Sequence, residues 1–152
     1  MAKLDIDFIG NEIADLTAYF EKTGNVVAAW RVFSLSRQHS RLIPDSVMAE
    51  VDRFATGVSA IADRAMQSSP DDRPLYFTPE KLGVLWRGDG GQNPADVLRR
   101  DWRDMKIGSE VWRRIEEYGD GVGEAIEHVA ARLPYVNGET VRKAWQKFRR
   151  GG

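Results

Sequence analysis

Residues 121–150 read GVGEAIEHVAARLPYVNGETVRKAWQKFRR, and this stretch decides the fold that we expect. Its first half repeats apolar residues at spacings of one, three and four, which places them on one face of a helix. Pro134 lacks a backbone N–H and disfavours helical geometry in the residue before it, so this helix should end near Arg132 or Leu133. Asn137 is suited to cap a second helix. The apolar face of that second helix holds Val141, Ala144, Trp145 and Phe148.

The outer face of the second helix is strongly basic. Residues 139–150 contain five basic residues and one acidic residue, in a chain whose formal net charge is −1. Each Lys or Arg that neutralises a DNA phosphate releases counterions, so such a face suits DNA binding with a salt-dependent affinity. Arginine and glutamine side chains also read base edges in the major groove. The residues that we expect to contact DNA are Asn137, Glu139, Thr140, Arg142, Lys143, Gln146, Lys147, Arg149 and Arg150.

The two helices resemble the helix-turn-helix of bacterial and phage DNA-binding proteins, whose motif reads roughly Val-Ala-x-x-Leu-Gly-Val-Ser-x-x-Thr-Val-Arg. The matching residues here are Val129-Ala130, Leu133, Val136, Asn137 and Thr140-Val141-Arg142. The usual turn glycine is absent, and Pro134-Tyr135 makes the turn longer by one residue. The resemblance is confined to the C-terminal end. It implies that double-stranded DNA is the partner and that the protein regulates transcription.

Two other readings of the basic hairpin stay open. In many all-α proteins a charged stripe is a solvated face without a ligand. The second reading belongs to another functional class, a non-enzymatic protein-interaction module such as a phage-encoded inhibitor or an assembly adaptor. In that module the basic hairpin binds an acidic protein surface. A DNA affinity that falls steeply with salt distinguishes DNA binding from both alternatives.

Helical periodicity dominates the rest of the chain, so we expect an all-α protein. Residues 1–67 predict three helices in an N-terminal bundle, which we assign to homodimerisation or partner docking. The third of these helices carries an inward apolar stripe from Val47 to Ala62. Residues 68–92 read as a linker with one short helix. Asn93-Pro94 then starts a long helix, which gives residues 93–152 the three helices of a helix-turn-helix unit.

Composition limits where the protein resides. The chain has 152 residues, 42% of them hydrophobic, which predicts a buried core in one ordinary domain or two very small ones. It contains no Cys, which excludes disulfides and thiolate metal sites and fits a reducing compartment. No apolar run reaches the roughly 20 residues of a membrane span or forms a signal peptide. We therefore expect a cytoplasmic protein that does not bind membranes.

No residue pattern predicts an enzyme, a metal site or a cofactor. His39 and His128 are on separate predicted helices, and neither has a second ligand at metal-binding spacing. The glycine-rich residues 88–91 lack the Lys and the hydroxyl of a Walker phosphate loop. Four tryptophans at helical spacing are expected to lie in the core rather than to stack on bases. They are Trp86, Trp102, Trp112 and Trp145.

Overall fold

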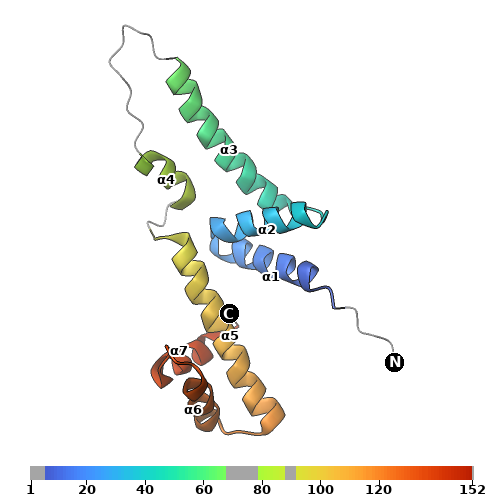
Figure 1. Cartoon of the computed structure of the whole chain (residues 1–152), viewed down its shortest axis with the longest axis vertical. Helices are drawn as coiled ribbons and strands as arrows, with labels where there is room; N and C mark the ends of the chain where they lie inside the picture. The colour runs from blue at the N-terminus through green and yellow to red at the C-terminus, as the bar shows by residue number, and fades with distance from the viewer. Residues whose placement is uncertain (1–5, 68–78, 88–91, 152) are drawn as a thin grey trace. The chain divides into compact units, whose positions relative to one another are not determined.

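The computed structural model describes residues 6–67, 79–87 and 92–151 (Figure 1). These ranges contain α-helices and no strands, which confirms the all-α class expected from the sequence. The helices are α1 (Phe8–Thr23), α2 (Val26–Gln38), α3 (Asp45–Met66), α4 (Pro79–Arg87), α5 (Pro94–Tyr118), α6 (Val122–Arg132) and α7 (Gly138–Arg149). Among the described residues, no helix contains an apolar segment of membrane-spanning length.

The chain divides into two compact units, an N-terminal unit of residues 1–97 and a C-terminal unit of residues 98–152. The division falls within α5, a few residues after the start that we expected at residue 93. Of the expected linker, residues 68–78 and the glycine-rich residues 88–91 lie outside the described residues. The short helix expected within the linker is α4.

α4 packs against α2 and α3 of the N-terminal unit. The ring centroid of Trp86 lies 4.6 Å from that of Phe54 on α3 and 5.9 Å from that of Trp30 on α2. The Arg53 guanidinium donates to the carbonyl oxygen of Leu85 at 2.7 Å and also pairs with Glu50. These contacts make α4 part of the N-terminal unit.

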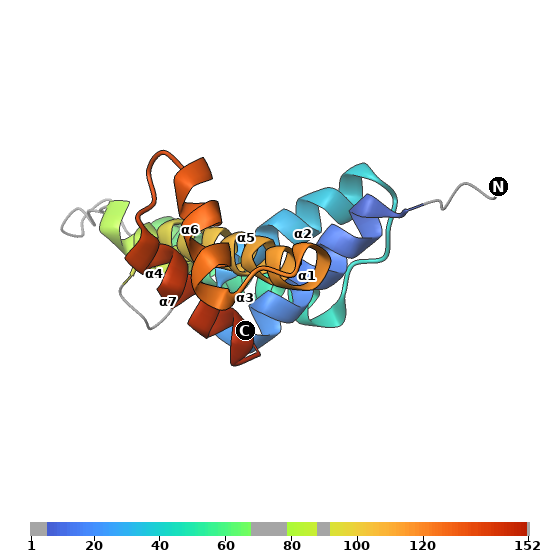
Figure 2. The ribbon, with the colours of Figure 1, turned by 90° about the horizontal axis from the view of Figure 1, so that it is seen from below.

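Local signals set the first helix ends in the N-terminal unit. Asp7 caps α1 by accepting the N–H of Gly10 at 2.9 Å, and this bond, together with the ion pair to Arg41, lowers the pKa of Asp7. Gly24 closes α1 in the left-handed conformation with φ of 70°. Asn25 follows at once and caps α2 by accepting backbone N–H groups. The result is a hairpin in which α1 and α2 lie side by side (Figures 1 and 2).

The apolar stripe of α3 is covered mainly in its N-terminal half. Val47 is fully buried there, and Phe54 lies against Trp30. Val58 is 38% exposed, and Ala55 and Ala62 are also exposed. Our expectation of an inward stripe from Val47 to Ala62 is therefore wrong for Ala55, Val58 and Ala62, whereas Ile61 is partly buried. The reason is visible in Figure 1, where the C-terminal half of α3 extends beyond α1 and α2.

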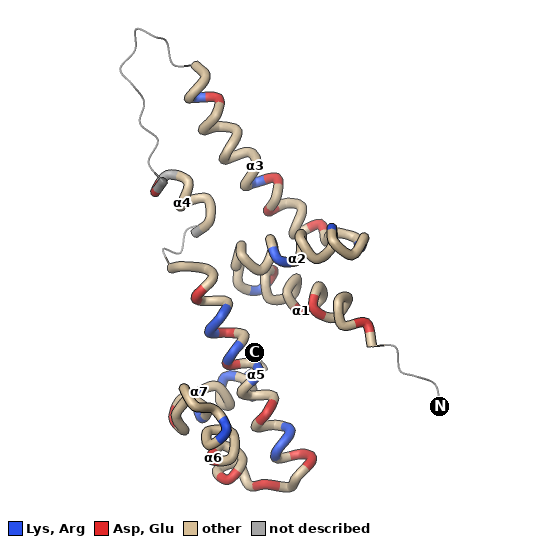
Figure 3. Tube along the Cα trace, viewed as in Figure 1, with Lys and Arg blue, Asp and Glu red and all other residues tan. Residues whose placement is uncertain are grey.

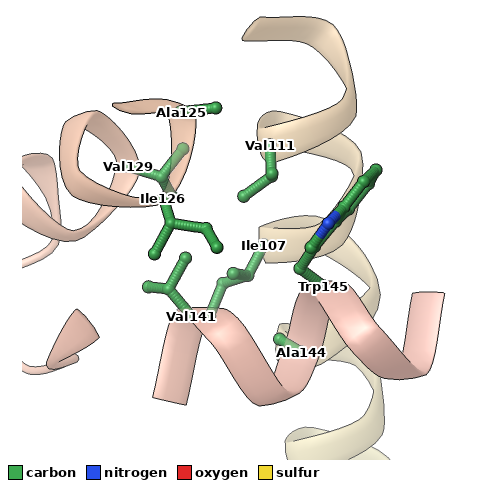
Figure 4. Close-up of a cluster of buried hydrophobic side chains, with 8 residues drawn as sticks. All are labelled: Ile107, Val111, Ala125, Ile126, Val129, Val141, Ala144 and Trp145. Carbon is green, nitrogen blue, oxygen red and sulfur yellow. The ribbon is translucent and has the colours of Figure 1, made fainter. Parts of the chain in front are cut away.

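The three helices of the C-terminal unit share one core (Figure 4). α5 contributes Ile107 and Val111 to it, and α7 crosses α5 at this point. The remaining core side chains come from α6 and α7 and are Ala125, Ile126, Val129, Val141, Ala144 and Trp145. The helices of this unit are thus held together by aliphatic and aromatic packing. This packing fixes which face of α7 is buried and which face is exposed.

The four tryptophans expected in the core divide into two groups. Trp145 is buried, with 8% of its surface exposed, and Trp102 is partly buried. The expectation is wrong for Trp112, which is 49% exposed. Trp86 is 42% exposed but packs one side of its ring against Phe54 and Trp30. Trp112 is exposed because the core is formed by a neighbouring face of α5, the one that carries Ile107 and Val111.

Candidate nucleic-acid interface

The connection between α6 and α7 turns its apolar side chains toward the core. α6 ends at Arg132, where Pro134 predicted its end. Leu133 and Val136 both pack against the core, and the N–H of Val136 donates to the carbonyl oxygen of Leu133 at 3.3 Å. Tyr135 points away and is 97% exposed. The connection is therefore held by packing, although it lacks the usual turn glycine.

Asn137 starts α7 and confirms the predicted cap. Its Oδ1 atom accepts the backbone N–H and the side-chain hydroxyl of Thr140, each at 2.9 Å. Both residues thus have a structural role in starting the helix. Gly138 follows, and a Cβ atom placed there would meet no atom within 4 Å. Asn137, Gly138 and Glu139 are exposed at the start of α7.

The two faces of α7 differ sharply. Val141, Ala144 and Trp145 are buried on one face, and Phe148 is partly buried beside them. All the side chains at the other positions from Arg142 onward are exposed. They are Arg142, Lys143, Gln146, Lys147, Arg149 and Arg150. Because the buried face is locked into the core, α7 cannot rotate without unpacking the C-terminal unit.

We call Arg142, Lys143, Gln146, Arg149 and Arg150 the outer row of α7. Within the described residues, Arg142 and Arg150 form no ion pair and Gln146 forms no hydrogen bond. Lys143 lies 3.8 Å from Glu139 in an exposed pair, which contributes little stability. The Arg149 guanidinium lies 6.0 Å from the ring centroid of Trp145. The outer row therefore holds four cations whose charge is opposed only weakly, by Glu139.

Lys147 differs from the outer row because it reaches back to α5. Its Nζ atom lies 2.7 Å from Oδ1 of Asp101 and 3.9 Å from Oδ2 of Asp104. Both carboxylates are largely buried, with side chains 19% and 16% exposed. Figure 3 shows this mixture of acidic and basic residues along α5 beside α7. Lys147 thus has acidic partners on α5, whereas the only ion pair of Lys143 is the weak one to Glu139 within α7.

A second polar cluster holds the connection between α5 and α6. Asp120 pairs with Arg114 at 2.6 Å and with Nδ1 of His128 at 3.2 Å, and Arg114 also contacts His128. The Arg114 guanidinium stacks on the Tyr118 ring, 4.5 Å from its centroid. Gly119 closes α5 in the left-handed conformation, with φ of 71°. This cluster gives His128 a structural role in fixing the connection.

Sequence reasoning identified the exposed positions of α7 but missed the partners on α5. Asp101 and Asp104 are three residues apart, which places them on one side of a helix. That spacing is visible in the sequence, yet nothing local shows that Lys147 lies opposite. No family model, curated protein or solved structure matches this chain.

Proposed function

We propose that the C-terminal unit binds double-stranded DNA through the outer row of α7. In this proposal α6 and α7 act as a helix-turn-helix, and α7 enters the major groove. The observation that carries the proposal is the arrangement of α7: a rigidly packed inner face and an outer row of four exposed cations. A role in transcriptional regulation is the part of the proposal that rests on the resemblance of residues 129–142 to the helix-turn-helix motif.

Phosphate neutralisation is the expected main source of affinity. Each phosphate contact lowers the slope of log affinity against log salt by about 0.9. The four cations of the outer row therefore predict a slope of roughly −3 to −4. Lys147 contributes less, because DNA binding would have to break its ion pair with Asp101.

We assign discrimination between DNA sequences to Arg142 and Gln146 of the outer row. Arg142 and Gln146 are exposed and one helical turn apart, and neither is engaged by another described residue. Arginine donates two hydrogen bonds to a guanine edge, and glutamine pairs similarly with adenine. Glu139 is suited to accept a hydrogen bond from cytosine. Asn137 and Thr140 act mainly by positioning the start of α7, since they bond to each other.

Helix-turn-helix proteins commonly bind paired half-sites as dimers. In this proposal the homodimer forms through the N-terminal unit. Apolar side chains are exposed on α3 and α4 of this unit. They include Val58, Met66, Leu82, Val84 and Trp86. Sedimentation equilibrium of the whole protein tests this part by itself, and a monomer at all concentrations would refute it.

The proposal is tested by fluorescence anisotropy of the full chain with labelled duplexes of about 30 base pairs. Affinity for a random duplex should fall roughly 100-fold between 50 and 200 mM salt, as the slope requires. Protection of selected genomic fragments from nuclease cleavage then tests sequence-specific binding, which regulation requires. Specific sites should bind at least about 1,000-fold tighter than random DNA.

Two outcomes would count against DNA binding. The first is the absence of any complex with DNA at low salt. The second is equal affinity for DNA and for polyglutamate of matched charge, with no preferred genomic site. Either result would favour the alternative in which the basic hairpin binds an acidic protein surface.

A further inference from the structure

α5 has a second apolar face that the core of the C-terminal unit does not use. Its side chains recur at spacings of three, four and seven residues, which places them on one side of a helix. They are Leu98, Trp102, Met105 and Trp112. Met105 is 41% and Trp112 is 49% exposed. We call this set the outer stripe of α5.

The two borders of the outer stripe differ. Along one border, α7 lies against α5, with Phe148 in contact with Gly108. Along the other border, basic residues recur seven residues apart at Arg99, Lys106 and Arg113. All three are exposed, and Lys106 forms no ion pair within the described part of the chain. Arg113 lies 4.0 Å from Glu117, at the limit of an ion pair.

A second copy of the protein does not fit this face. A two-fold axis that pairs two α5 helices antiparallel brings the same border of both stripes together. The row containing Lys106 and Arg113 would then face its own copy, and like charges at such positions oppose pairing. A parallel pair would bring the basic border of one copy to the border that α7 already covers. Electrostatics and packing therefore disfavour self-association here.

An acidic amphipathic helix would match both the apolar outer stripe of α5 and its basic border. Its apolar residues at positions i, i+3, i+4 and i+7 would cover Met105 and Trp112, as in other helix-on-groove complexes. Carboxylates along one edge would pair with Lys106 and Arg113. We propose that the outer stripe of α5 and its basic border bind an acidic amphipathic helix of a partner protein. This site lies on α5 and is separate from the outer row of α7.

The test uses the full chain and two synthetic helical peptides of about 18 residues. Both carry leucine at the apolar positions, and they differ only in having glutamate or lysine at the flanking positions. Anisotropy of the labelled peptides at low salt should show the glutamate peptide binding about tenfold tighter or more. The double variant Lys106→Glu, Arg113→Glu should reverse this preference. The control Arg37→Glu, Arg64→Glu makes the same charge change in the N-terminal unit and should leave the preference unchanged.

Substitutions in the stripe test the apolar part. Trp112→Ala should weaken binding of the glutamate peptide about tenfold while the helical circular dichroism spectrum stays unchanged, because the side chain is half exposed. Met105→Ala should also weaken binding of the glutamate peptide. It replaces Trp112→Ala as the test if that variant does not fold. Unchanged binding by both variants would overturn the proposal, as would equal affinity for the two peptides. The proposal would also be overturned if the variant Arg142→Glu, Lys143→Glu lost binding of the glutamate peptide while Lys106→Glu, Arg113→Glu kept it. That result would place the peptide-binding site on α7. A dimer that Trp112→Ala dissociates would assign the stripe to a second copy instead.

Discussion

Gly108 of α5 and Phe148 of α7 are in direct contact where the two helices cross. A Cβ atom at Gly108 would lie 2.6 Å from Cγ of Phe148 and would also collide with its Cβ. Cβ of Phe148 is bonded directly to the backbone, so a change of rotamer cannot move it aside. The absence of a side chain at Gly108 thus sets how closely α7 approaches α5.

This contact predicts that Gly108→Ala destabilises the C-terminal unit. Alanine favours a helix over glycine by about 1 kcal/mol, but overpacking costs about 1–3 kcal/mol. We expect a net loss of up to about 2 kcal/mol in the free energy of unfolding, measured by urea titration. Gly123→Ala on α6 is the control, because its new methyl group would meet no atom within 4 Å. Equal stability of the two variants would show that α7 adjusts freely.

Trp145→Ala should lower the free energy of unfolding by about 3 kcal/mol, as for other large aromatic truncations in a core. Trp145 is 8% exposed and lies 6.0 Å from the Phe148 ring. Trp145→Phe should cost much less, because Nε1 of Trp145 is buried and donates to no described residue. If Trp145→Ala kept its stability but lost DNA binding, the indole would have to be a stacking residue.

Arg142→Ala and Lys143→Ala together should leave the fold intact and weaken DNA binding. Both side chains are exposed and lie off the buried face of α7. The salt slope measured by anisotropy should become shallower by up to about two for two lost phosphate contacts. If Arg142 reads a guanine, discrimination between sequences should fall as well. Arg37→Ala, Arg64→Ala removes the same charge from the N-terminal unit, and a similar loss there would reveal a general charge effect.

Lys143→Ala and Lys147→Ala form a matched pair on one helix, four residues apart. Lys143 has a weak exposed partner at 3.8 Å, whereas Lys147 lies 2.7 Å from Asp101. Lys143→Ala should therefore reduce the salt slope by about one, and Lys147→Ala by clearly less. Lys147→Ala should instead cost up to about 1 kcal/mol of stability. A larger loss of DNA affinity for Lys147→Ala would show that its ammonium leaves Asp101 to bind phosphate.

Helix ends and helix faces followed from local residue chemistry. Asn137 has a side-chain oxygen within reach of the N–H groups that a new helix leaves unpaired, and it caps α7 as predicted. Gly24 readily adopts the left-handed conformation that ends α1. The spacing of Val141, Ala144 and Trp145 placed them on one face, which is the buried face of α7. Each of these features depends on neighbours within a few residues.

Features that depend on two helices were decided only by the tertiary structure. The sequence shows one long apolar pattern in α5, but only packing separates the buried Val111 from the exposed Trp112. Asp101 and Lys147 are 46 residues apart in sequence, and the crossing of α5 and α7 brings them within 2.7 Å. The same crossing gives Gly108 its contact with Phe148. Residue spacing determines which side chains share a face, whereas the angle and distance between helices determine which face is covered and which charges meet.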